Sequence, residues 1–213
     1  MPKLGMKPIR RRQLIDATIA VISKFGFGDA TVSRIAKRAG VSPGIVHHYF
    51  EDKHALLEAA MRDLLEQLRT AVAGRLALAE TPVQRAEAVI DGNFSAEQFS
   101  REAITAWLAF WAHAPHDPAL MKLRRINLAR AHSNLVSALK WVMPKASVDD
   151  AVDGLVALID GLWLRAALSG GRPDREALRT IARDYLDRLI GDTRDGPSLI
   201  KGTTRTGGFA WER

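Results

Sequence analysis

Residues 31–53, TVSRIAKRAGVSPGIVHHYFEDK, constrain the fold of this chain more than any other stretch. In the first half of the stretch, apolar residues recur at i, i+3, i+4 and i+7, which predicts a short helix with one apolar face. Gly40 suits the turn that follows, because glycine adopts a left-handed backbone without steric cost. Ser42 and Pro43 are typical of the N-cap and first position of a second helix. Two helices joined this closely indicate a helix-turn-helix, whose second helix enters the DNA major groove; an ordinary helical corner is the alternative.

The positive charge of the chain lies almost entirely on the segment that contains this motif. Residues 1–54 hold ten Lys or Arg against four Asp or Glu, whereas residues 55–213 hold twenty-one against twenty. Such an excess of cations is what contacts with DNA phosphates require. Residues 1–9 are expected to form an arm that, with residues 10–12, meets the DNA backbone, although a solvated terminus explains the same residues.

The rest of the chain predicts an all-α protein of about nine helices, because no stretch of comparable length alternates with period two. We expect a helix-turn-helix DNA-binding domain at residues 1–54 and a helical effector-binding and dimerisation domain at residues 55–191. Residues 192–213 are expected to form a mobile tail. The helices expected outside the motif are 14–25, 52–78, 83–90, 101–113, 119–142, one from Ser147 or Asp149 to Gly170, and 175–190.

The composition excludes several classes of protein. The chain has no cysteine, which excludes disulfides, thiolate metal sites and a cysteine nucleophile. The basic N-terminus lacks the small-residue cleavage site of a secretion signal. The longest apolar run, Gly154 to Gly170, contains Asp160 and Arg165 and is too short to span a bilayer. We therefore expect a soluble, cytoplasmic protein without a membrane partner.

Catalytic motifs are absent or isolated. Ser137 to Lys140 matches S-x-x-K, but it falls within an expected helix and lacks companion motifs. His113, His116 and Asp117 flank a proline turn without further metal ligands. We expect no enzyme, no cofactor and no bound metal. A sequence-neutral DNA-binding protein is a third class, which would show strong salt dependence without preference among DNA sequences.

A family resemblance joins these observations. The segment ATVSRIAKRAGVSPGIVHHYFEDKHALL resembles the head of the TetR family of one-component transcriptional regulators, over about residues 10–58. Four further segments are similar to BetI-type repressors of the choline to glycine betaine pathway, up to about residue 190: MPKLGMKPIRRRQLIDAT, GNF at 92–94, AWLAFWA at 106–112 and LIDGLWLRAALSG at 158–170.

The resemblance implies a homodimer that binds double-stranded, palindromic operator DNA. It also implies repression of genes for betaine synthesis or choline uptake, with choline or a related quaternary ammonium as the effector. A TetR-family paralogue of another pathway, with a different cationic or apolar effector, is the alternative.

The resemblance also implies which residues contact DNA. His47 stands where many members of the wider family have a tyrosine, so a phosphate contact made by a tyrosine hydroxyl lacks its donor here. Ile45 and Val46 are expected to pack back onto the first helix of the motif. The predicted DNA-binding residues are Arg11, Thr31, Ser33, Arg34, Ser42, Gly44, His47, His48, Tyr49 and Lys53.

The effector site is predicted from residues that suit a quaternary ammonium. Such a cation donates no hydrogen bond, so aromatic faces and a carboxylate recognise it, with cation–π terms of about 2 kcal/mol each when desolvated. Helical aromatics at this spacing also suit a packed core, and Asp160 also suits an ion pair with Arg124 or Arg165. The predicted effector-binding residues are Trp107, Phe110, Trp111, Asp160 and Trp163.

Residues 148–169 are predicted to carry an apolar stripe, formed by Val152, Leu155, Val156, Ile159, Leu162 and Ala166. Paired with residues 119–142, this helix is expected to build a four-helix dimer interface, with burial inside one subunit as the alternative. A ligand in the body is expected to shift helix 52–78. That shift would change the separation of the two recognition helices, which must match successive major grooves.

Overall fold

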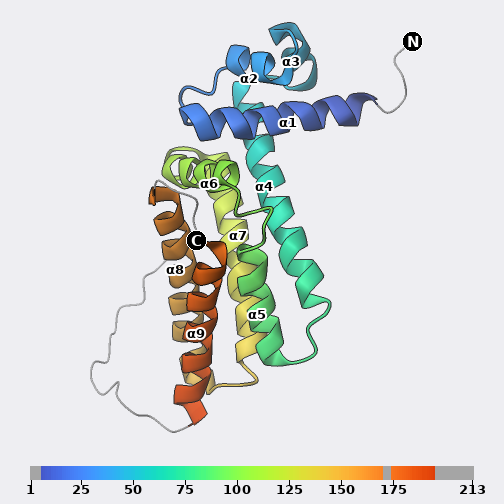
Figure 1. Ribbon diagram of the computed structural model, residues 1–213. Helices are drawn as coiled ribbons and strands as arrows, with labels where there is room; N and C mark the ends of the chain where they lie inside the picture. Colours follow the sequence, from blue (N-terminus) through green and yellow to red (C-terminus); the bar gives the residue numbers. More distant parts are fainter. Residues whose placement is uncertain (1–5, 170–173, 195–213) are drawn as a thin grey trace.

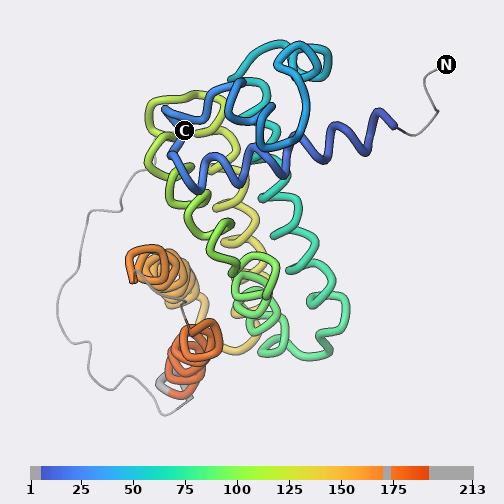
Figure 2. The backbone as a smooth tube through the Cα atoms, turned by 45° about the horizontal axis from the view of Figure 1, so that its top comes forward, coloured from blue at the N-terminus to red at the C-terminus, as the bar shows by residue number. Residues whose placement is uncertain are grey.

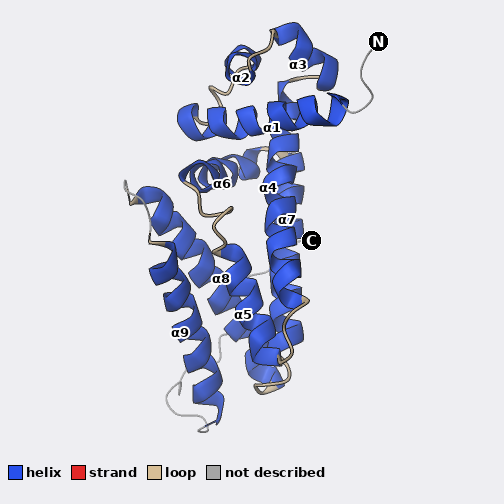
Figure 3. Ribbon diagram, turned by 45° about the vertical axis from the view of Figure 1, so that its right-hand side comes forward, coloured by secondary structure: helices blue, strands red, loops and turns tan. Residues whose placement is uncertain are grey.

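The computed structural model describes residues 6–169 and 174–194, and these residues form nine α-helices, one short 3₁₀ helix and no strand (Figure 3). The expected all-α class is confirmed. The elements are α1 (Met6–Phe25), α2 (Val32–Ala39), α3 (Pro43–Tyr49), α4 (Lys53–Leu76), α5 (Pro82–Asn93), α6 (Arg101–His113), η1 (Ala114–His116), α7 (Pro118–Leu139), α8 (Lys145–Leu168) and α9 (Arg175–Arg194).

The helices form a head and a body that are joined along α4 (Figure 1). The helix α1 lies across the upper end of α4, with α2 and α3 above it and α6 packed beneath it. In the body, α5 and α7 pack beside α4. The pair α8 and α9 stands at the opposite edge and is seen nearly end-on in Figure 2. The head therefore meets the body through α1, α4 and α6.

The head has a small apolar core because each of its three helices turns one face inward. Leu14 and Ile22 of α1 are fully buried, and Ile35 of α2 lies against them. Val46 of α3 closes the same core with 1% of its surface exposed. The short helices α2 and α3 are thus held by burial rather than by their own length, which is too small for an isolated helix to be stable.

The helix α4 is anchored at its first turn and along the head. The Ala55 N–H donates to the Asp52 carboxylate at 2.7 Å, so Asp52 is the N-cap of α4. Arg12 of α1 donates to Asp63 of α4 at 2.6 Å. Because Met61 is buried between these contacts, α1 and the upper part of α4 pack as one unit.

The helices α4 and α5 cross where Gly92 lies against Val72. A β-carbon at position 92 would come within 2.8 Å of the Val72 Cα, so the two backbones approach this closely only because residue 92 is glycine. The Asn93 amide donates to the Val89 carbonyl at 2.9 Å, and the following Phe94 is 1% exposed. The GNF segment therefore fixes this crossing and the exit of the chain from α5.

Several helix ends differ from those expected. The helix α1 already starts at Met6, because Pro8 falls in the first turn, where no backbone N–H needs an intrahelical acceptor. Residues 6–9 are thus helical rather than part of an arm, and residues 1–5 lie outside the described residues. The helix α8 begins at Lys145, directly after Pro144, instead of at Ser147 or Asp149.

At the C-terminal side, residues 192–194 end α9 instead of starting the expected tail. The remainder of that tail and the expected helix end at Gly170 lie outside the described residues. Within residues 6–169 and 174–194, no helix combines the length and apolar character that crossing a membrane requires.

The apolar stripe of α8 faces the core of the same subunit. Val152 and Leu155 have no exposed surface, and only Val156 is partly exposed among the six stripe residues. Burial inside one subunit is therefore the correct alternative for this stripe. The outer side of α8 is a different face, formed by Ala157, Gly161, Leu164 and Leu168, all of which are exposed.

Candidate DNA interface and effector site

The connection between α2 and α3 has the backbone of a Schellman turn. Gly40 adopts φ 67° and ψ 36°, and the N–H of Val41 donates back to the Ala36 carbonyl at 3.0 Å. At the other end of α2, the Thr31 hydroxyl accepts from the Arg34 N–H at 3.3 Å. The helix-turn-helix expected from the sequence is therefore present.

Eight of the ten predicted DNA-binding residues are exposed, and Tyr49 and Lys53 are half-buried. The Ser42 hydroxyl makes no capping hydrogen bond, although Ser42 is the N-cap of α3, so the hydroxyl is available to a ligand. The His48 ring meets the ring of half-buried Tyr49 edge-on at 5.2 Å. The exposed residues are Arg11, Thr31, Ser33, Arg34, Ser42, Gly44, His47 and His48.

The recognition helix also exposes a residue that was expected to be buried. Val46 is 1% exposed, but the neighbouring Ile45 is 39% exposed, so the expectation that both pack inward is wrong for Ile45. Consecutive residues of a helix point in directions about 100° apart, and on α3 it is Val46 that faces the head core. An exposed aliphatic side chain on this helix suits contact with a thymine methyl group.

Two of the predicted cations are held by the head itself. The Arg34 guanidinium donates to the Asp29 carbonyl at 2.6 Å and lies 4.5 Å from the centre of the Phe25 ring. The Lys53 ammonium donates to the Gly28 carbonyl at 2.8 Å. These contacts fasten the loop between α1 and α2 to the helices that flank the motif.

Arg11 is placed in a similar way, with its guanidinium 4.9 Å from the Phe50 ring centre. Together with Thr31, whose hydroxyl caps α2, these residues position the motif through contacts within the chain. Contacts, and not exposure, therefore divide the predicted residues. Arg11, Thr31, Arg34 and Lys53 contact other parts of the head. The outer set makes none of these contacts and consists of Ser33, Ser42, Gly44, His47 and His48.

In the body, α6 and α8 bring the three predicted tryptophans together. The ring centres of Trp107 and Trp163 are 6.0 Å apart, and Trp111 lies 6.2 Å from the first and 6.4 Å from the second. Trp107 and Trp163 are buried, whereas Trp111 is partly exposed. Phe110 packs on the inner side against Trp107 and is 1% exposed. Because the rings pack against one another, a ligand that binds between them would have to separate them. Trp111 forms the partly exposed edge of this aromatic cluster.

The loop between α5 and α6 completes this aromatic cluster. The Phe99 ring lies 5.2 Å from Trp163, and the Trp107 indole N–H donates to the Gln98 side-chain oxygen at 3.2 Å. Gln98 has no exposed surface, and its Nε2 has no hydrogen-bond partner among the described residues. Sequence reasoning missed both residues, because residues 95–100 follow no helical period.

Asp160 lies half-buried on α8, one turn before Trp163. Burial raises the pKa of Asp160 above its ordinary 3.8, and the charge of Arg124 on α7 opposes this shift. Among the described residues Asp160 forms neither a hydrogen bond nor an ion pair. Arg124, and not Arg165, is therefore the cation that acts on it, and a bound cation would favour its ionised form.

Two contacts link the effector region to the head. His113, at the end of α6, stacks on Phe27 of the head with ring centres 4.8 Å apart. Asp117, the N-cap of α7, lies 2.6 Å from the His54 Nε2 at the start of α4. Two of the side chains considered as metal ligands, His113 and Asp117, thus serve this junction. No three metal-binding side chains converge within the described ranges.

Comparisons with known proteins agree with both halves of this arrangement. Residues 14–60 match the profile of bacterial regulatory proteins of the tetR family, and residues 82–191 match the C-terminal domain of BetI-type transcriptional repressors. The HTH-type transcriptional regulators BetI of Escherichia coli O17:K52:H18 (strain UMN026 / ExPEC) and of Escherichia coli (strain K12) are each 52% identical over 192 residues. Each alignment covers 89% of this chain and 98% of the relative.

Solved structures share the fold. A transcriptional regulator from Pseudomonas aeruginosa PAO1 has a TM-score of 0.70 and 27% identity, covering 91% of this chain and 96% of its own. A regulator from Saccharomonospora viridis, solved in complex with choline, has a TM-score of 0.74 and 20% identity over 84% of this chain and 96% of its own, which shows likeness of fold alone. The relatives are DNA-binding regulators and not enzymes, as expected. With both halves matched, this chain belongs to the TetR family and carries the C-terminal domain of its BetI-type transcriptional repressors.

Proposed function

We propose that this chain is a cytoplasmic, homodimeric repressor that binds a palindromic operator and responds to choline or a related quaternary ammonium. The observation that supports this effector most directly is the meeting of Trp107, Trp111 and Trp163 beside the helix turn that carries Asp160. Aromatic faces and a carboxylate are the groups that bind a cation without hydrogen-bond donors. The 52% identity to BetI regulators supports control of choline uptake or glycine betaine synthesis genes.

DNA is bound, in this proposal, by the domain of residues 1–54. The members of the outer set on α3 read base edges. Hydrogen-bonding groups are carried by Ser42, the N-cap of α3, and by His47 and His48 in its last turn. Arg11 and Lys53 orient the motif and face the phosphate backbone. The domain of residues 55–191 holds the effector and the dimer contact.

The dimer contact is placed on the outer face of α8 and α9, which replaces the expected pairing of α8 with α7. Leu164 is 42% exposed and Leu168 is 70% exposed, and Ile181 of the adjacent α9 is 41% exposed. A β-carbon at Gly161 would meet no heavy atom within 4 Å, so the subunit itself does not require glycine there. A second copy would cover these apolar groups in a four-helix arrangement.

Effector entry is coupled to the head through α6. Trp111 lies two residues before His113 on α6, so parting the tryptophan rings displaces the end of this helix. His113 contacts Phe27, and the neighbouring Asp117 contacts His54 on α4. Movement in the body therefore reaches both the loop after α1 and the start of α4.

The proposal is tested by fluorescence anisotropy of the full chain on labelled DNA from its own upstream region, with choline titrated in at fixed salt. Trp111→Ala should raise the choline concentration needed for half the response about tenfold, as expected for one lost cation–π contact, while operator affinity is kept. Trp141→Ala is the matched control, because Trp141 is 73% exposed and belongs to no aromatic cluster.

The outcomes separate the parts of the proposal. Specific binding that ignores choline would favour the paralogue with another effector. Equal loss of operator affinity and choline response in Trp111→Ala would contradict the effector site, and absence of preference over a scrambled duplex would contradict the repressor itself.

A further inference from the structure

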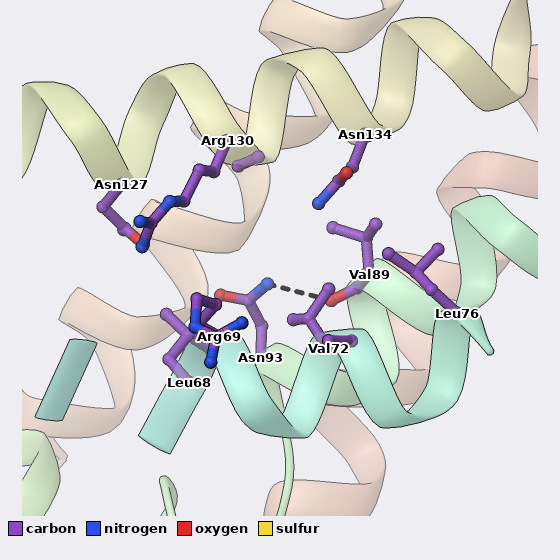
Figure 4. Close-up of a pocket in the computed structure, with 11 residues that line it drawn as sticks. Leu68, Arg69, Val72, Leu76, Val89, Asn93, Asn127, Arg130 and Asn134 are labelled. Carbon is purple, nitrogen blue, oxygen red and sulfur yellow. Dashed lines mark hydrogen bonds between the residues drawn. The ribbon is translucent and has the colours of Figure 1, made fainter. Parts of the chain in front are cut away.

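A groove of about 260 Å³ lies between α4, α5 and α7, away from the aromatic cluster. Its floor is apolar, with Leu68, Val72 and Leu76 from α4 and Val89 from α5. Its rim is cationic and amide-rich (Figure 4). The rim side chains are Arg69, Asn93, Asn127, Arg130 and Asn134.

The rim amides and cations face one another across the groove. Figure 4 shows Asn127 and Arg130 projecting from α7 toward Arg69 and Asn93. Asn127, Arg130 and Asn134 share one face of α7, since they are spaced by three and four residues. Their side chains form no hydrogen bond or ion pair within residues 6–169 and 174–194. Three groups able to donate hydrogen bonds therefore point into one groove without acceptors from the described chain.

The charges at the groove leave one cation in excess. Arg69 is neutralised by Glu66, whose carboxylate accepts from the Arg69 Nε at 2.7 Å. The hydrogen bond and the charge of Arg69, and after them the charge of Arg130, lower the pKa of Glu66. Glu66 is thus ionised and matched by Arg69, and the positive charge of Arg130 remains available to an anion.

We infer that this α4–α5–α7 groove binds a small aliphatic monocarboxylate. The carboxylate accepts from the Arg130 guanidinium, whose planar fork matches two carboxylate oxygens, and from the asparagine amides beside it. The aliphatic body covers the leucine and valine floor. The volume lies just below the usual range of ligand pockets, which favours a small ligand.

The same geometry separates this ligand from others. A quaternary ammonium is repelled by Arg130 and finds no aromatic face in the groove. Inorganic phosphate matches the guanidinium but has no apolar body to cover Leu68 and Val72. The inference therefore goes beyond the proposed choline site, because it concerns a second site with the opposite charge preference.

Titration calorimetry of the full chain with sodium hexanoate tests the inference, with 1-hexanol and inorganic phosphate as comparison probes. Hexanoate should bind saturably, and both comparison probes at least about tenfold more weakly. Arg130→Gln should weaken hexanoate binding about tenfold or more, because it removes a charge-assisted hydrogen bond. Arg125→Gln is the matched control: Arg125 is exposed on the same helix and does not line the groove.

Absence of saturable hexanoate binding, equal binding of hexanol or phosphate, or equal losses in the two arginine variants would each overturn the monocarboxylate site. Choline added to the hexanoate complex should leave hexanoate bound, and displacement of hexanoate by choline would overturn the separation of the two sites. The choline response of the unmodified protein is measured independently on operator DNA, so failure of the proposed function is distinguishable from failure of this inference.

Discussion

Gly92 of α5 lies against the backbone of α4, with the Val72 Cα only 2.8 Å from where a β-carbon would stand. Gly92→Ala should lower the free energy of unfolding by about 1–3 kcal/mol, because a backbone atom rather than a flexible side chain must move. Urea unfolding followed by circular dichroism measures the change.

Gly74→Ala supplies the control for this substitution. Gly74 lies on the exposed side of α4, and a β-carbon there meets no heavy atom within 4 Å. Alanine should stabilise the helix by up to about 1 kcal/mol. Similar destabilisation by both substitutions would contradict the close crossing at Gly92.

Asp160 gives the proposed choline response a pH dependence. Because burial raises the pKa of Asp160 above 3.8, its carboxylate is protonated at a higher pH than that of an exposed aspartate. Choline affinity should fall as the pH decreases through this raised pKa. Asp160→Asn should weaken choline binding about tenfold at neutral pH and abolish the dependence. Quenching of tryptophan fluorescence measures both, and identical pH profiles would exclude Asp160 from the site.

The raised pKa of Asp160 also affects folding stability, which should increase as the pH falls, whereas choline affinity should decrease. A folded-state pKa above the unfolded value contributes stability that is full below pH 3.8 and is lost as the pH rises through the raised pKa. At neutral pH, Asp160→Asn should therefore raise the unfolding midpoint while it weakens choline binding. A carboxylate that is retained at the expense of stability is typical of a binding residue.

At the same scale, the sequence predicts the aromatic side chains but not all their neighbours. Trp111 and Trp163 were predicted from residue type and helical position, and they do meet. Phe99 and Gln98 were missed because they lie on a loop, where no period shows which side faces the body. The choice between Arg124 and Arg165 as the cation near Asp160 also depended on the packing of α7 against α8.

Among the elements, α7 depends on Asp117, the residue that caps its start. Burial alone would raise the pKa of Asp117, but hydrogen bonds from the Leu120 N–H and from His54 outweigh it, and the pKa lies below 3.8. Asp117→Ala should lower the free energy of unfolding by about 1–2 kcal/mol at neutral pH, because α7 loses its cap. This stabilisation is present above pH 3.8 and is lost as the pH falls through the lowered folded pKa.

Urea unfolding of Asp117→Ala and the unmodified protein at several pH values measures this difference. The difference in unfolding free energy between the two proteins should persist down to about pH 3.8 and should disappear only at lower pH. Asp150→Ala, at an exposed position of α8, should change little. A constant gap across the whole acid range would show that the carboxylate charge is not involved.

Helix positions were predicted well wherever local signals decide them. The bounds of α6 are those expected, since Ser100 caps its start and Pro115 follows its end. The inward face of α8 was not predictable in the same way. Both its Val152 side and its Leu164 side are apolar, and periodicity does not distinguish a subunit core from a surface between subunits.

For the whole molecule, Gly161 offers a direct test of the proposed dimer. A β-carbon at position 161 meets no heavy atom of the same subunit within 4 Å, so Gly161→Arg should leave the helical content unchanged. It should convert the dimer to a monomer and weaken operator binding by more than about a hundredfold, because the two recognition helices no longer bind together. Analytical ultracentrifugation and anisotropy measure the two effects.

Leu78→Arg is the control for this variant. Leu78 is 82% exposed near the lower end of α4 and lies on neither α8 nor α9. It should leave both the sedimentation and the operator affinity unchanged. A Gly161→Arg protein that remains dimeric would require the contact to lie elsewhere on the surface.

The ion pair between Arg12 of α1 and Asp63 of α4 ties the head to α4, so the head moves together with this helix. With 24 residues, α4 is about 36 Å long, so a tilt of about 5° at its lower end carries the attached head by about 3 Å. In a two-fold dimer the displacements of both heads add, against a half-site spacing of about 34 Å. A tilt of this size would therefore change the separation of the two heads by more than the rise of one base pair.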